Sequence, residues 1–204
     1  MATSKYSVQD YVFQFITVTI GVLIALLING LVEWNHDREL VASARATMAK
    51  EIDANKKEID NSIAASAATT KRFDTALQFA ADLLRDKKTT LKEMNLKLDL
   101  ADISSTAWHT AERTGALALM DYDEVQRYSR LYDLQDLFIE QQRGLLAQLT
   151  IASSIFTGDF DIDKPNVKDL EAFRERVTQL SGAYEINQQM ARQLAKRYTE
   201  ALQR

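Results

Sequence analysis

The N-terminal part of the chain is a long, uncharged and mostly apolar run. From Val12 to Val32 there are 21 residues without a charged side chain. About 20 apolar residues in a helix match a hydrocarbon core roughly 30 Å thick. The run is longer than the apolar core of a signal peptide, and no small-x-small cleavage site follows it. Tyr11 and Trp34 stand at its ends, where interfacial aromatic residues are common. This pattern predicts a retained transmembrane anchor over residues 1–34.

Small or weakly polar side chains recur at every fourth position of the predicted span. The set that shares one side of the helix is Thr17, Gly21, Ala25 and Asn29. Small residues at this spacing let a second helix approach closely, and an asparagine can hydrogen-bond across such a contact. Glycine and alanine are also simply frequent in membrane spans. A helix-association face and plain span composition are therefore both consistent with the pattern.

Beyond the span the hydrophobic pattern becomes amphipathic. Apolar residues recur mostly every fourth position, and no glycine or proline occurs between Gly30 and Gly115. This predicts one long helix over 35–86, continuous with the span, with a bend in the small-residue segment 62–70. In 86–104 leucines alternate with charged residues, which is typical of a strand, but a lone strand has nothing to pair with. We expect a connector that lays its leucines on the bundle.

A short helix and then a long one are predicted after the connector. Ser104 or Ser105 can cap the short helix, which Gly115 interrupts or ends. Asp121, with Glu124 three residues later, has the spacing of a capping box. A long apolar stripe of helical period follows this pair and predicts the third helix.

The last predicted helix follows the only proline of the chain. Gly158 is placed like the C-terminal cap of the third helix, and Asn166 like the N-cap of the last one. Consecutive helices joined by short loops pack as antiparallel neighbours. The predicted fold class is therefore all-α, with one N-terminal transmembrane helix that continues into an antiparallel bundle of long helices over 35–204.

Composition and motifs argue against the common catalytic and metal sites. The chain has no cysteine, and its net charge of −4 gives no basic footprint for nucleic acid. Di-iron bundles need two Glu-x-x-His pairs, and only Glu33 with His36 has that form. The acidic turn from Asp159 to Asp163 lacks the glycine and glutamate of a calcium loop. We therefore expect no enzymatic activity, no metal and no cofactor.

A second candidate surface is rich in tyrosine and arginine, the residue types enriched at interface hot spots. The candidate contacts to a protein partner or a small ligand are Trp108, Arg113, Tyr122, Arg127, Tyr128, Arg130 and Tyr132. Plain packing is the alternative, because Tyr128 and Tyr132 lie four residues apart and can border the core. In that case Trp108 also packs inward.

Two stretches of the chain resemble a group of bacterial single-span membrane proteins to which no activity is assigned. They are ITVTIGVLIALLINGLVEWNHDRE and AWHTAERTGALALMDYDEVQRYSRLYDLQD, together about a quarter of the chain. The matching positions are Gly21, Val22, Leu23, Ile24, Ala25, Leu26, Asn29, Trp34, Trp108, Gly115, Leu119 and Tyr132. The resemblance implies an anchor in the bacterial inner membrane and a helical domain on the periplasmic side.

The charges next to the span give the opposite indication of topology. Arg38, Arg45 and Lys50 follow the span, and the positive-inside rule would keep that side in the cytoplasm. Acidic residues are mixed among them, and long domains translocate largely regardless of charge. The sequence therefore leaves the side of the membrane open.

Three functional hypotheses follow from the sequence. The first is a membrane-anchored, non-enzymatic helical interaction or assembly module, with a protein partner or a second copy of the chain as its contact. The second is a sensor-type ligand-binding bundle that signals through a partner. The third is a membrane-linked enzyme, which would require several titratable groups converging in one cleft.

Overall fold

The computed structural model of the chain describes residues 8–85, 95–156 and 165–203. In chain order its elements are α1 (Val8–Leu84), α2 (Thr106–Arg113), the 3-10 helix η1 (Ala116–Leu119), α3 (Tyr122–Ser153), the 3-10 helix η2 (Ser154–Phe156) and α4 (Val167–Leu202). Every element in these ranges is helical, which confirms the predicted all-α class. The predicted cap at Gly158 and the acidic turn 159–163 lie outside the described residues.

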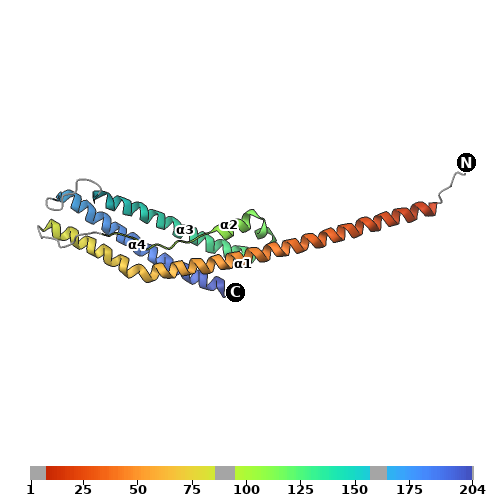
Figure 1. Cartoon of the computed structure of the whole chain (residues 1–204), viewed down its shortest axis with the longest axis horizontal. Helices are drawn as coiled ribbons and strands as arrows, with labels where there is room; N and C mark the ends of the chain where they lie inside the picture. The colour runs from red at the N-terminus through yellow and green to blue at the C-terminus, as the bar shows by residue number, and fades with distance from the viewer. Residues whose placement is uncertain (1–7, 86–94, 157–164, 204) are drawn as a thin grey trace.

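α1 is a single helix of 77 residues that leaves the bundle at its N-terminal end (Figure 1). In the projecting part, an 18-residue window has a mean hydropathy of 2.5 and none of it is buried. This part is therefore long and apolar enough to cross a membrane. Segment 62–70 stays helical, and Figure 1 shows α1 changing direction without a break in its orange-to-yellow part.

The bundle is built from α1, α3 and α4, with α2 and η1 at the end nearer the projecting helix (Figure 1). α3 runs in the same direction as the bundle part of α1, and α4 returns antiparallel to both. Phe73 of α1 and Tyr184 of α4 meet edge to face with ring centroids 5.6 Å apart. One face of each long helix is buried in this way, as the apolar stripes predicted.

Two large apolar clusters form the core. The proximal cluster, nearer the projecting helix, includes Met48, Ile52, Ile59, Phe138 and Leu194. The distal cluster includes Phe73, Leu145, Phe173, Val177 and Leu180. Burying aliphatic and aromatic side chains of this size contributes roughly 1.5–3 kcal/mol each, so these clusters, rather than helix propensity, hold the helices together.

Residues 95–105 form neither helix nor strand and connect α1 to α2 along the bundle surface. Leu96 and Leu98 are buried in the distal cluster, while Lys97 is exposed. The alternation of leucine and charged residues thus reflects an extended segment with one face on the bundle, as we expected for the connector. We call residues 95–105 the connector below.

The predicted capping box at the start of α3 is only half formed. Asp121 is the N-cap, and its Oδ1 accepts hydrogen bonds from the backbone N–H of Asp123 (2.9 Å) and of Glu124 (3.3 Å). Glu124 does not return the bond, because its carboxylate accepts two hydrogen bonds from Arg45 of α1, at 2.8 and 2.6 Å. A bidentate, charge-assisted pair is stronger than a bond to a backbone amide, so the pairing to α1 prevails.

The caps of α2 and α4 are simpler. Ser105 stands at the N-cap of α2 without a side-chain cap bond, and the Oγ of Ser104 accepts from the N–H of Thr106 at 3.1 Å. Asn166 caps α4 as predicted, with its Oδ1 accepting from Lys168 N at 3.0 Å. Gly115 separates α2 from η1 with a φ of 78°, a left-handed conformation that favours glycine.

Two glycines inside long helices offer a stability test. Gly144 and Gly182 are exposed, and a Cβ at either would have no atom within 4 Å. We expect Gly144→Ala and Gly182→Ala each to raise the free energy of unfolding by about 0.5–1 kcal/mol, because alanine restricts the unfolded backbone. Urea unfolding of the full chain in mild detergent, followed by circular dichroism, measures this. Gly115→Ala is the matched control and should lower stability; a loss at Gly144 or Gly182 would contradict an open helix surface there.

Candidate functional site

The predicted helix-association face lies on the projecting part of α1. All four of its residues are exposed. The hydroxyl of Thr17 donates to the carbonyl of Phe13 at 2.9 Å, so it is satisfied within the helix. Gly21 has open space around its Cα. The amide side chain of Asn29 makes no hydrogen bond within the described part of the chain, which leaves it available to a neighbouring helix.

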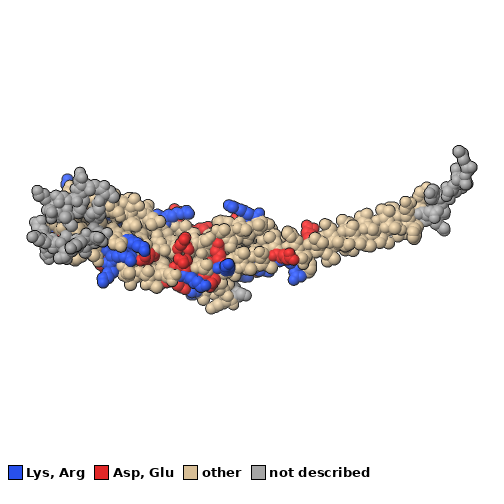
Figure 2. Space-filling view, viewed as in Figure 1, with Lys and Arg blue, Asp and Glu red and all other residues tan. Residues whose placement is uncertain are grey.

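The junction between the projecting helix and the bundle is where charged residues begin. Figure 2 shows the projecting helix free of charged side chains on the face in view, up to a group of acidic and basic residues near the bundle. The guanidinium of Arg38 lies 4.6 Å from the ring centroid of Trp34, a cation–π distance. Burial in the core starts at Val41. The junction thus combines an exposed tryptophan with the first charges.

Trp108 and Tyr132, two of the candidate contact residues, stack on each other in the core nearer the projecting helix. Their ring centroids are 5.3 Å apart, with an interplanar angle of 18°. The hydroxyl of Tyr132 donates to Glu51 at 3.0 Å, and the other carboxylate oxygen of Glu51 accepts from Ala107 N at 2.9 Å. Burial, and then the charge of Glu51, raise the pKa of Tyr132, so it stays a neutral donor. This group joins α1, α2 and α3.

A buried amide network lies beside it and reaches all three long helices. Gln135 accepts hydrogen bonds from Asn55 (3.1 Å) and from the hydroxyl of Tyr198, and it donates to the carbonyl of Ser104 (2.8 Å). Asn55 pairs with both backbone groups of Ser104, at 2.7 and 3.0 Å. Burial raises the pKa of Tyr198. Such a fully paired network fixes the relative positions of α1, the connector, α3 and α4.

The remaining candidate contact residues are not part of these groups. Tyr128 is half-buried, and burial raises the pKa of its phenol. The exposed ones are Arg113, Tyr122, Arg127 and Arg130. The hydroxyl of Tyr122 accepts a hydrogen bond from the amide nitrogen of Gln126 at 2.8 Å, and Arg130 donates one to the amide oxygen of Gln126 at 3.2 Å. The seven residues therefore divide into a stacked pair packed on the core, a half-buried tyrosine and four solvent-exposed side chains.

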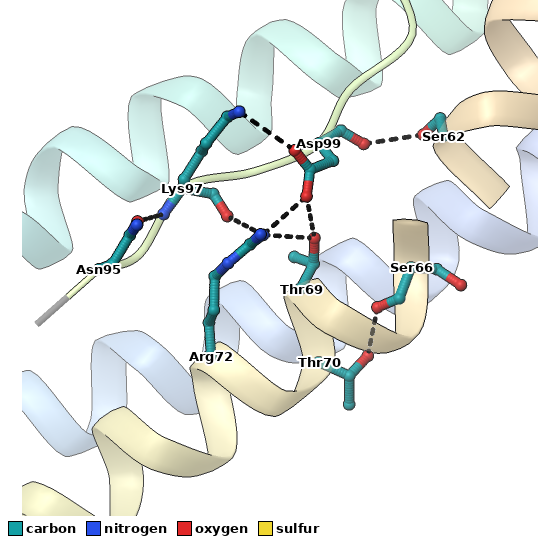
Figure 3. Close-up of polar contacts among 8 residues, drawn as sticks. All are labelled: Ser62, Ser66, Thr69, Thr70, Arg72, Asn95, Lys97 and Asp99. Atoms are coloured by element: carbon teal, nitrogen blue, oxygen red, sulfur yellow. Dashed lines mark hydrogen bonds and ion pairs between the residues drawn. The ribbon is translucent and has the colours of Figure 1, made fainter. Parts of the chain in front are cut away.

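A second polar cluster holds the connector on α1 (Figure 3). One nitrogen of Arg72 donates to the carboxylate of Asp99 (2.7 Å), to the carbonyl of Lys97 (3.0 Å) and to Thr69 (3.2 Å). The hydroxyl of Ser62 donates to the carbonyl of Asp99 at 2.8 Å. The Arg72 guanidinium keeps the pKa of the Asp99 carboxyl below its ordinary value. Side chains of α1 thus bind the backbone carbonyls of Lys97 and Asp99 in the extended connector.

The lowered pKa of Asp99 gives a pH-dependent contribution to stability. It is present above the ordinary carboxyl pKa of 3.8 and is lost as the pH falls through the lowered folded-state value. Asp99→Asn should therefore cost up to about 1 kcal/mol at pH 7, as for a partly exposed ion pair, and less at pH 3. Urea unfolding at the two pH values measures the difference. A cost that does not change between them would rule out the ion pair as its source.

No group of three or more His, Asp or Glu side chains arranged to hold a metal ion occurs among residues 8–85, 95–156 and 165–203. The single Glu-x-x-His pair, Glu33 and His36, is exposed at the junction. Sequence reasoning missed the partly buried Glu51 and the buried Asn55 and Gln135. The available signal was that Asn55 occupies a core-facing position between Ile52 and Ile59.

Comparison with protein-family models, with curated proteins and with solved structures finds no match to this chain. Its own geometry is therefore what bears on its function.

Proposed function

We propose that the chain is a membrane-anchored, non-enzymatic helical module of the bacterial inner membrane, whose span associates with a second copy of itself. The observation that carries this is the unpaired amide of Asn29 on the exposed projecting helix, on the same side as Gly21 and Ala25. In hydrocarbon no water is available to satisfy an amide. A second helix, brought close by small side chains, can do so.

The rest of the structure supports an assembly role over a catalytic one. The two polar networks pair their members with each other and with backbone groups, so their donors and acceptors are used to hold helices and connector in place. α1 takes part in both networks and also forms the projecting helix. A module of this kind presents its bundle at a fixed position relative to the anchor.

Cysteine crosslinking tests the association directly, because the chain has no cysteine of its own. Gly21→Cys and Ala25→Cys place a thiol on the proposed face. Leu23→Cys and Leu27→Cys are matched controls, since two residues turn a helix by about 200°. We expect oxidation in native membranes to give disulfide dimers of the first pair only, and Asn29→Leu to reduce them. Monomers throughout, or equal crosslinking at all four positions, would refute a specific helix pair.

The periplasmic location of the bundle is part of the same proposal and rests on the resemblance of the span and of the Trp108 region. Leu137 is exposed on α3 and is 62% accessible, so Leu137→Cys gives a reactive thiol on the bundle surface. A membrane-impermeant maleimide added to intact cells should label it. Labelling only after the cells are lysed would instead place the bundle in the cytoplasm.

A further inference from the structure

A layer of buried polar residues separates the two apolar clusters of the bundle. On α1 it lies between Ile59 of the proximal cluster and Phe73 of the distal cluster. On α3 it lies between Phe138 of the proximal cluster and Leu145 of the distal cluster. The residues that define this central polar layer are Thr69 of α1, Gln142 of α3, and Asn187 and Gln188 of α4. All four are less than 9% exposed. The core therefore changes from apolar to polar and back along the bundle axis.

The carboxamides of this layer lack hydrogen-bond partners. Asn187 is 0% exposed and Gln188 is 3% exposed, yet neither amide atom of either side chain forms a hydrogen bond within the described residues. The amide nitrogen of Gln142 and the hydroxyl of Tyr184, one turn before Gln188 on α4, are also unpaired there. Unpaired buried polar groups are rare in native proteins, and a bound water or ligand is a common explanation.

The facing side of α1 does not supply the missing partners. Ser62 donates to the Asp99 carbonyl at 2.8 Å, and Thr69 donates to the Asp99 carboxylate at 3.3 Å, as Figure 3 shows. Both hydroxyls are thus engaged by the connector. The residues between them are alanines, a serine and Ile63, with no side-chain amide or charge among them. This part of α1 therefore offers the carboxamides no free amide or charged partner, and a further polar group at this level is the hydroxyl of Tyr184 on α4, which lies beside Thr69 and Gln188.

The unpaired atoms define the chemistry of a ligand. Gln142, Asn187 and Gln188 present amide nitrogens that donate, and the last two also present oxygens that accept. The nearby charges of Arg72 and Asp99 already pair with each other, and a charged ligand would be buried without a counter-charge. We propose that the central polar layer is a binding site for a small uncharged molecule that both donates and accepts hydrogen bonds, either ordered water or a small amide-like solute.

Nuclear magnetic resonance of the ¹⁵N-labelled full chain in detergent micelles tests this at the side-chain amides. Acetamide is the probe; acetate, which is charged, and acetone, which only accepts, are controls of similar size. If the site takes a solute, acetamide alone should shift the Asn187 and Gln188 resonances saturably. Asn187→Leu should then weaken the response at Gln188 about tenfold, the effect of losing one good contact.

If the site takes water, the side-chain amide resonances of Asn187 and Gln188 should not shift with any of the three probes but should show cross-peaks to long-lived bound water. Gln179, which is exposed on α4, is the internal reference for contact with bulk water. Either result supports the site and distinguishes its occupant. Resonances that respond to no probe and show no bound water would overturn it, because the carboxamides would then be paired within the protein. None of these measurements requires self-association of the span.

Discussion

Phe138→Ala is expected to lower the free energy of unfolding of the bundle by about 3–5 kcal/mol, the usual cost of removing a buried phenylalanine ring. Phe138 is 0% exposed and lies in the proximal cluster, where α3 packs on α1 and α4. The ring is larger than its neighbours can replace by small shifts, so a cavity remains. Urea unfolding of the full chain in mild detergent, followed by circular dichroism, measures the loss.

The neighbouring residue provides a matched control for this substitution. Leu137 is 62% exposed on the same helix, so Leu137→Ala should change stability by no more than about 0.5 kcal/mol. The projecting helix is unburied, so crosslinking through Ala25→Cys should survive Phe138→Ala. Equal losses at positions 137 and 138 would contradict the packing of α3, and loss of crosslinking would show that the span depends on the bundle.

Gln135→Met is expected to lower the free energy of unfolding by about 2–4 kcal/mol. Methionine keeps nearly the same volume, so the loss measures hydrogen bonding rather than a cavity. Gln135 is 0% exposed, and its oxygen accepts from both Asn55 and Tyr198. Without it the buried hydroxyl of Tyr198 has no acceptor for its proton, which costs about 1–3 kcal/mol in addition to the lost bonds.

Tyr198→Phe separates these contributions. It removes the hydroxyl that Gln135→Met would leave unpaired, so the double variant should lose less than the sum of the single variants. We expect a coupling of about 1 kcal/mol or more between the two positions, measured by the same urea unfolding. Additive losses would mean that the hydroxyl of Tyr198 does not depend on Gln135.

The architecture could be predicted because its causes are local in sequence. The scarcity of glycine and proline, together with a four-residue apolar spacing, gave α1, α3 and α4 close to their observed bounds. α1 ends at Leu84, near the predicted end at 86. The N-caps at Asp121 and Asn166 have a mechanism that operates within three residues. The other half of the capping box did not form because Glu124 binds Arg45, which is 79 residues away in the chain.

The polar interior could not be predicted because it depends on register between helices. Asn55, Gln135 and Tyr198 meet only when α1, α3 and α4 are aligned in one way, and nothing in their local sequences encodes that alignment. The same holds for the carboxamides of Gln142 and Asn187. Tyrosine and arginine near residues 122–132 were more conspicuous in the sequence, yet most of these side chains lie in solvent. Whether they contact a partner stays a prediction.

The continuity of α1 has a consequence for any pair of chains. Because the helix is unbroken from Val8 to Leu84, the rotational phase of the span is fixed relative to the bundle. One residue inserted into 33–40 would turn the face of Gly21 and Asn29 by about 100° with respect to α3 and α4, whereas seven would restore it to within about 20°. If two chains pair through that face, as we propose, the pairing also determines which sides of the two bundles lie opposite each other.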